Sequence, residues 1–150
     1  MRGVPTQQAN GGVTTQVGGG HGSASSNAMF TATNTSAGSN DVDGGNCILD
    51  SPTWNVAQAS DLAVWYFHGQ RDTADDPSGD FFRLELSTDG GSTWSTLASN
   101  GDSAQNAAWT QATATIPAGS SVRLRVQASD GAGPGDLVEA GIDDVSICPQ

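Results

Sequence analysis

Apolar and polar residues alternate along several stretches of this chain, and the alternation predicts β-strands. Residues 122–128 are apolar at every second position, with Arg123 and Arg125 between the apolar ones. Residues 81–87 follow the same rule, with Arg83 on the polar side. A period of two places one set of side chains in a core and the other set in solvent. We therefore predict two strands whose arginines point outward.

Other stretches complete an all-β pattern. Residues 62–68 are apolar on both sides, which is typical of a strand in the middle of a sheet. Asp89-Gly90-Gly91 predicts a hairpin turn, and no long apolar stripe has the helical spacing of 3.6. About eight strands between turn signals predict a sandwich or a barrel. The remaining strands are expected in residues 27–33, 47–49 with 54–56, 93–97, 109–116 and 137–148.

The length of 150 residues fits one domain with a core of its own. The first 27 residues differ from the rest because they are polar and rich in glycine. We divide the chain into this N-terminal segment, residues 1–27, and a β-sandwich over residues 28–150. The segment is either part of the same domain or loosely held against it.

The charge balance limits the partners of this chain. Sixteen acidic residues against five basic ones give a net charge of −11, which disfavours binding to nucleic acids and to anionic membranes. The longest apolar run, residues 62–67, is much shorter than the roughly 20 residues of a bilayer span. An acidic chain without lysine fits an extracellular protein, although solubility alone would also explain it. We expect a secreted, monomeric piece of a longer protein.

Clustered carboxylates form the first candidate site. Asp41 and Asp43 lie in a glycine-rich turn, and Asp143 and Asp144 lie together in the last strand with Glu139 nearby. Ca²⁺ takes six to eight oxygen ligands, which loops rich in Asp and Gly supply. The apolar neighbours of Asp143 and Asp144, among them Val145, are expected in the core, where two adjacent carboxylates are costly unless a cation or an arginine neutralises them. We predict a structural Ca²⁺ site on these five residues; the alternative is a solvated turn plus surface charge.

Arginine and tryptophan side chains form the second candidate site. Arg83, Arg123 and Arg125 would line up if their strands are neighbours, and guanidinium groups bind carboxylates in pairs of hydrogen bonds. An exposed ring, Trp65 or Trp109, would cover the apolar face of a sugar. These five residues predict a polysaccharide site, with a uronate-containing or sulfated glycan as one ligand class. The alternatives are core packing of the rings and cross-strand pairing of the arginines with Glu85 and aspartates.

Two further motifs concern structure. Ser87-x-Asp89-x-Gly91-x-Thr93-Trp94 matches the Asp-box, a hairpin in which the aspartate bonds to backbone N–H groups and the tryptophan packs over the turn. Cys47 and Cys148 are the two cysteines, and we predict a disulfide between them, with buried thiols as the alternative.

Signatures of catalysis are weak. Neither His21 nor His68 belongs to a metalloprotease motif, and no nucleophile elbow or phosphate loop occurs. Carboxylates of the acidic stretch 72–80 could act in glycoside hydrolysis, but a loop holds two carboxylates poorly at a fixed separation. We predict that the chain is not an enzyme.

The order of these motifs resembles a known class of domain. Asp41-Val42-Asp43-Gly44-Gly45, the Asp-box, Val122-Arg123-Leu124-Arg125-Val126 and Gly141-Ile142-Asp143-Asp144-Val145 together resemble the calcium-binding jelly-roll modules of secreted bacterial hydrolases and adhesins. They are similar to MAM domains, cleaved-adhesin domains and carbohydrate-binding modules. The resemblance implies a two-sheet antiparallel β-sandwich with jelly-roll topology. It also implies Ca²⁺ between an early loop and the last strand, with Asp143 and Asp41 or Asp43 as ligands.

The resemblance carries an expected function. We expect a non-catalytic module of a larger secreted bacterial enzyme that binds polysaccharide and holds the enzyme near its substrate. The alternative is a structural or adhesin-like domain beside a secreted peptidase, which would contact protein and have no affinity for glycans.

Overall fold

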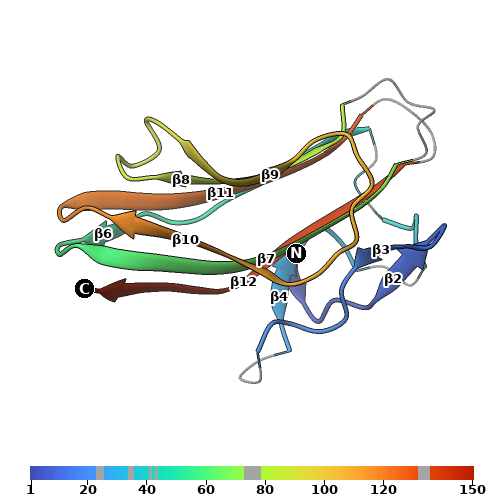
Figure 1. The fold of residues 1–150 in the computed structure, drawn as a ribbon, viewed down its shortest axis with the longest axis horizontal. Coiled ribbons are helices and arrows are strands. Elements are labelled where there is room, and N and C mark those ends of the chain that lie inside the picture. The colour runs from blue at the N-terminus through green and yellow to red at the C-terminus, as the bar shows by residue number, and fades with distance from the viewer. Residues whose placement is uncertain (23–25, 34–35, 41, 43, 73–78, 132–135) are drawn as a thin grey trace.

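The alternating stretches form strands of two antiparallel sheets that face each other (Figure 1). The computed structural model describes residues 1–150 except 23–25, 34–35, 41, 43, 73–78 and 132–135. Twelve strands occur in the described residues: β1 (Arg2–Gly3), β2 (Gln8–Asn10), β3 (Val13–Gln16), β4 (Ala28–Phe30), β5 (Gly45–Asp50), β6 (Trp54–Val56), β7 (Ser60–Arg71), β8 (Phe81–Ser87), β9 (Ser95–Asn100), β10 (Thr110–Ile116), β11 (Ser120–Asp130) and β12 (Leu137–Pro149).

The strand order is that of a jelly roll. The first sheet has the order β1-β4-β12-β7-β10, and the second has the order β5-β11-β8-β9, with β6 also paired to β11. From β4 onward, the chain changes sheet at most connections, and the β8–β9 hairpin stays within one sheet. The predicted all-β sandwich with jelly-roll topology is confirmed. In the described part of the chain, no helix is long and apolar enough to span a membrane.

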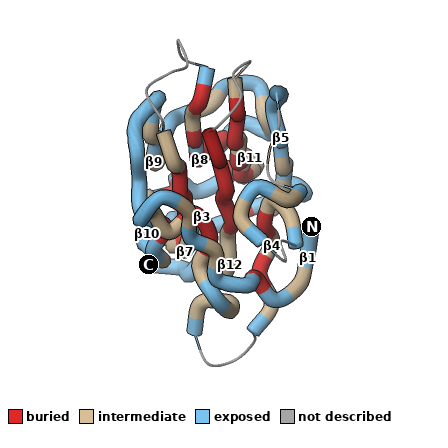
Figure 2. Tube along the Cα trace, turned by 90° about the vertical axis from the view of Figure 1, so that its right-hand side faces the viewer, coloured by how far each residue is buried: buried red, intermediate tan, exposed pale blue. Residues whose placement is uncertain are grey.

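The core lies between the two sheets. Leu62 and Val64 of β7 and Leu84 of β8 are almost fully buried, and they meet Val122 and Leu124 of β11. In Figure 2, buried positions are red and lie along central strands such as β8 and β11. The side chains that alternate with them point away from the core, as a period of two requires.

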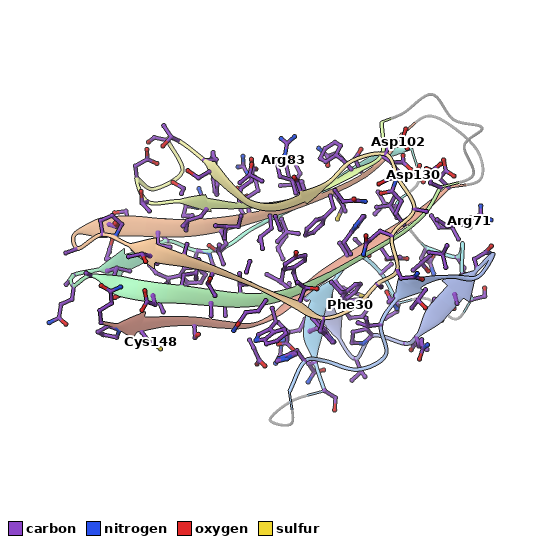
Figure 3. All side chains as sticks on the ribbon, in the orientation of Figure 1. Phe30, Arg71, Arg83, Asp102, Asp130 and Cys148 are labelled. Atoms are coloured by element: carbon purple, nitrogen blue, oxygen red, sulfur yellow. The ribbon has the colours of Figure 1, made fainter. Side chains whose placement is uncertain are left out.

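One end of the sandwich is polar inside. His68 and Gln70 continue the inward-facing side of β7, and both are buried. Asp80, Asp130 and Asp136 are also buried at the strand ends, and Asp130 is labelled at this end in Figure 3. The apolar core therefore gives way to a polar layer near the loops.

The N-terminal segment adds short strands to the outside of the first sheet. β1 pairs with β4, β2 pairs with β3, and β3 packs against β7. Thr15 and Gln16 of β3 are buried. A Cβ atom placed on Gly69 of β7 would lie 2.1 Å from the carbonyl oxygen of Thr15. The two backbones therefore meet at a position where only glycine fits.

A bulge interrupts β12 between Asp143 and Ser146. Asp144 adopts a left-handed backbone conformation there, with φ of 45°, which is uncommon for a residue other than glycine. The bulge shifts the register, so Val145, which we expected in the core, is 38% exposed. The expectation for Val145 was wrong because strict alternation does not continue through a bulge.

The disulfide predicted between Cys47 and Cys148 is absent. Both cysteines are free and exposed. Cys47 of β5 lines a cavity together with Ala140 and Ile142 of β12, whereas Cys148 lies six residues beyond Ile142, near the other end of the sandwich (Figure 3). Six strand residues span about 20 Å, and bridged cysteines have Cα atoms within about 7 Å.

Candidate functional site

Three arginines lie on the outward face of the second sheet. β8 and β11 are neighbours, with Arg125 opposite Glu85, Arg123 opposite Ser87 and Arg83 opposite Gln127. The side chain of Arg83 points away from the sandwich in Figure 3. The structure thus brings the three predicted arginines onto one surface, which we call the arginine face.

Asp50 of β5 compensates two of these charges. Arg125 donates two hydrogen bonds to its carboxylate, at 2.7 Å from Nε and 2.8 Å from Nη2, and Arg123 donates a third at 3.2 Å. The hydrogen bond from Arg125 is the main reason why the pKa of Asp50 lies below its usual value. Cross-strand pairing, the alternative considered above, therefore accounts for Arg123 and Arg125.

Arg83 has a different environment. Its guanidinium carbon lies 5.4 Å from the centroid of the Phe81 ring, and it forms no ion pair with any residue that the structure describes. Arg83 is exposed. It is therefore the arginine on this face whose charge is least compensated.

Trp94 completes the arginine face. The guanidinium carbon of Arg125 lies 4.3 Å from the Trp94 ring centroid, which is a close cation–π contact. The bidentate bond to Asp50 and the contact with Trp94 hold Arg125 from two sides. The Asp-box predicted only a structural role for Trp94. The β8–β9 hairpin that carries it also carries Arg83, and its strand β8 pairs with the strand of Arg125.

The Asp-box fixes the position of Trp94. Asp89 accepts hydrogen bonds from the backbone N–H of Thr93 at 2.9 Å, from its hydroxyl at 2.6 Å and from the Ser87 hydroxyl at 2.7 Å. These bonds hold the pKa of Asp89 well below its usual range, and the two from Thr93 contribute most. Gly91 takes a positive φ of 100° at the turn, and its N–H donates to Ser87 at 2.8 Å. The hairpin thus has the bonding that the motif predicts.

Trp65 and Trp109 lie on the other sheet, so the predicted ligand-binding set divides into two places. The His21 ring stacks on Trp65 with 3.7 Å between centroids. Trp109 contacts the Phe67 ring edge to face at 5.1 Å. Both tryptophans are half-buried. We expected Trp65 or Trp109 beside the arginines, and this expectation was wrong. A strand that is apolar on both sides gives no signal for which of its sides faces the core.

Asp143 and Asp144 bind the N-terminal segment. The backbone N–H of His21 donates to Asp143 at 2.9 Å, and the His21 ring nitrogen Nδ1 lies 2.8 Å from the Asp144 carboxylate. Cβ atoms on Gly20 and Gly22 would come within 2.8 and 2.9 Å of these carboxylates. His21 and its glycine neighbours therefore occupy the position where a cation or an arginine was expected.

The predicted calcium ligands are not brought together among the described residues. Glu139 is 1% exposed and accepts a hydrogen bond from Thr31, and it lies four residues from Asp143 along β12. Asp41 and Asp43 lie outside the described residues. No group of three metal-ligating side chains occurs in the part of the chain that the structure describes. Asp143 and Asp144 are engaged by His21, and Glu139 is a buried carboxylate, a type of group that Ca²⁺ accepts as a ligand.

An apolar groove follows the open edge between the sheets. A cavity of about 550 Å³ contains Trp54, Val145 and Ile147 in its lining. A second cavity of about 340 Å³ shares Trp54 and Val145 and extends to Met29 and Leu49. The groove lies between β6 and the end of β12, and the lining of its second cavity also includes Asp50, the ion-pair partner of Arg123 and Arg125.

Comparison with solved structures supports the fold. The chain is similar to the K3 cleaved adhesin domain of Lys-gingipain from Porphyromonas gingivalis W83, with a TM-score of 0.52 and 14% identity over 87% of this chain and 78% of that one. The K1 domain of the same protein gives a TM-score of 0.52 and 16% identity over 86% and 78% of the two chains. A family 16 carbohydrate-binding module gives 0.44 and 9% identity over 86% and 79%. No protein-family model and no curated protein matches the sequence.

Proposed function

We propose that this chain is a non-catalytic carbohydrate-binding module whose ligand lies on the arginine face. The observation that carries the proposal is the fixed cluster of Arg125, Trp94 and Asp50 on an outward sheet surface. Protein–sugar contacts need planar groups and hydrogen-bonding groups in fixed positions. Arg125 is held by two neighbours before any ligand arrives, so little conformational entropy is lost on binding.

The side chains of the arginine face can bind the hydroxyl groups of glycans, and they are also compatible with acidic glycans. Asp50 and Glu85 offer acceptors, while Arg125 and Gln127 offer donors, and Gln127 already bonds to Glu85 at 2.8 Å. Arg83 is the residue that would attract a uronate carboxylate. We propose that the module belongs to a larger secreted bacterial protein and raises its effective concentration on polysaccharide.

Replacing Trp94 by alanine is expected to weaken polysaccharide binding by about 30-fold, since central aromatic contacts contribute about 2 kcal/mol or more. Affinity electrophoresis of the wild type and the variant in gels with alginate, pectin, xylan or β-glucan measures this loss. Arg125→Gln should weaken binding in the same gels. Arg2→Gln, a change of the same charge on β1, is the control and should migrate like the wild type.

The retardation pattern also identifies the ligand class. Binding to alginate or pectin that weakens with added salt would assign the recognition of acid groups to Arg83. Retardation by xylan or β-glucan that salt leaves unchanged would assign a neutral ligand. If no polysaccharide retards the protein, the proposal fails. The adhesin-like alternative would then be favoured, with the apolar groove as its available protein-binding surface.

The calcium site that we propose is centred on Glu139. The connection that carries Asp41 and Asp43 leaves β4 at Thr31, which donates to the buried Glu139 carboxylate. A buried carboxylate is stable when a cation neutralises it, and Asp and Gly residues of such a connection supply oxygen ligands. We propose that Ca²⁺ joins this connection to β12 through Glu139.

Excess EDTA is expected to lower the melting temperature by about 5–10 °C, because loss of a bound ion removes about 3 kcal/mol of linked stability. Differential scanning calorimetry at matched ionic strength measures the shift. Glu139→Gln should remove the difference between the melts with and without EDTA, while Asp144→Asn should keep it. An identical melt of the wild type with and without EDTA would contradict the proposal.

A further inference from the structure

A polar cavity of about 140 Å³ lies between the sheets on the β9–β10 side. It is separate from the apolar groove, since none of its lining residues belongs to that groove. The connection between β9 and β10 borders it, and a pair of backbone hydrogen bonds at 2.8 Å joins Gln105 of this connection to Gln70 of β7. Its lining includes Tyr66, His68, Phe82, Asn100, Gln105 and Thr110.

His68 is the unusual residue of this cavity. It is only 5% exposed, and neither of its ring nitrogens forms a hydrogen bond of normal geometry with a described residue. Its ring stacks on Phe82 with 5.0 Å between centroids, and Tyr66 stacks on Phe82 at 5.3 Å. Burial lowers the pKa of His68 to about 4. The side chain of Gln70 favours the charged ring and opposes this shift only in part, so the ring is neutral near pH 7.

A neutral imidazole requires a particular partner. One ring nitrogen donates and the other accepts, and buried polar groups without partners are costly. Among the described residues, none that lines the cavity carries an ionised side chain at neutral pH. Hydroxyl groups, which both donate and accept, match His68 together with Asn100 and Thr110, which also line the cavity. The aromatic rings supply the apolar wall that the C–H face of a sugar requires.

The size of the cavity fits a small ligand. A volume of about 140 Å³ holds several water molecules, but it is smaller than the pockets of 300–1,000 Å³ that enclose drug-sized ligands. Ser99 lines the cavity and is also the cross-strand partner of Arg83 on the arginine face. The cavity therefore adjoins one end of the proposed glycan surface.

We propose that this cavity binds one neutral, hydroxyl-rich ring, with His68 as its central hydrogen-bonding group. The ring is either a free monosaccharide or the terminal residue of a glycan chain. The inference shares its ligand class with the proposed function but involves different residues. It would add recognition of a chain end to binding along the chain.

The small number of histidine and tyrosine residues makes NMR spectroscopy a direct test. The chain has two histidines and one tyrosine, so the NMR signals of the His68 and Tyr66 rings can be followed one by one while His21 serves as an internal control. The probes are methyl glycosides of glucose, galactose, mannose and xylose at millimolar concentration. We expect saturable shifts of the His68 and Tyr66 signals with at least one probe and no shift of His21.

Ligands of different length distinguish a free monosaccharide from the end of a glycan chain. A glycan oligomer that ends in the same sugar should bind at least tenfold more tightly than the methyl glycoside if the cavity takes a chain end. Equal affinity would assign the cavity to the free monosaccharide. Absence of a saturable shift with every methyl glycoside and every oligomer would overturn the proposal and leave a cavity filled by water.

His68→Phe tests the role of the ring nitrogens. Phenylalanine keeps the stacking on Phe82 and removes both unpartnered nitrogens, so the variant should fold and melt at a higher temperature. Sugar binding, followed through the Tyr66 signal, should fall at least tenfold, while Arg2→Gln should bind like the wild type. Unchanged affinity in His68→Phe would overturn the proposal. Retardation in polysaccharide gels, tested with Trp94→Ala, is measured independently, so failure of this cavity leaves the proposed function standing.

Discussion

Replacing Gly69 by alanine is expected to detach β3 from β7 and to lower the free energy of unfolding by about 3 kcal/mol or more. The new Cβ atom would lie 2.1 Å from the carbonyl oxygen of Thr15, 2.6 Å from its carbonyl carbon and 2.7 Å from its Cα. All three are backbone atoms, so no rotation of a side chain relieves the clash. The N-terminal segment must move as a whole. Urea unfolding followed by circular dichroism measures the loss.

Gly101→Ala is the matched control for this substitution. No atom lies within 4 Å of a Cβ placed on Gly101, and its φ is not among the positive values. The control should stay within about 0.5 kcal/mol of the wild type. Equal stability of the Gly69→Ala and Gly101→Ala variants would contradict the close packing of β3 on β7.

Detachment should also be visible locally. Phe67 of β7 is fully buried on the same side of the sheet as Gly69, and Trp65 is stacked under His21. Losing the segment would uncover the Trp65 ring, on which His21 stacks, whereas Phe67 would keep its contacts with Phe30 and Trp109. We therefore expect red-shifted tryptophan fluorescence and proteolytic cuts before residue 28 in Gly69→Ala, at temperatures where the sandwich itself remains folded.

The sandwich could be predicted from the sequence because its main signals are local. Alternation in residues 81–87 and 122–128 identified two strands, and the structure pairs them with Arg83, Arg123 and Arg125 on one outward face. The Asp-box is local as well, since its bonds join Ser87, Asp89 and Thr93. A period of two or a turn motif contains enough information to fix such features.

The N-terminal strands could not be predicted in this way. β1, β2 and β3 are two to four residues long, and their sequence is polar and rich in glycine. They are ordered by contacts with distant strands, above all at Gly69. The partner of Asp143 and Asp144 was missed for the same reason, because His21 is 122 residues away from Asp143 in sequence. Spacing along the chain contains no signal for such a contact.

Acidification from pH 7 to pH 4 is expected to remove about 3 kcal/mol of stability through His68 alone. Burial lowers the pKa of His68 from its usual 6.5 to about 4 in the folded protein. Between these values, the unfolded chain binds a proton at this residue and the folded protein does not. The contribution of His68 to the free energy of unfolding therefore rises as the pH increases from about 4 to 6.5. Above that range this contribution is constant.

His68→Phe is expected to remove this slope. Urea unfolding at a series of pH values between 4 and 7, with the wild type and the variant side by side, measures the difference between the two curves. Asp50 and Asp89 have lowered pKa values, so the stability they contribute is present above the usual aspartate value of 3.8 and is lost below it. Their effects therefore fall outside the window. The gap between variant and wild type should widen by about 3 kcal/mol as the pH falls from 7 to 4. Parallel curves would mean that His68 is accessible to protons in the folded protein and that its ring is not isolated between the sheets.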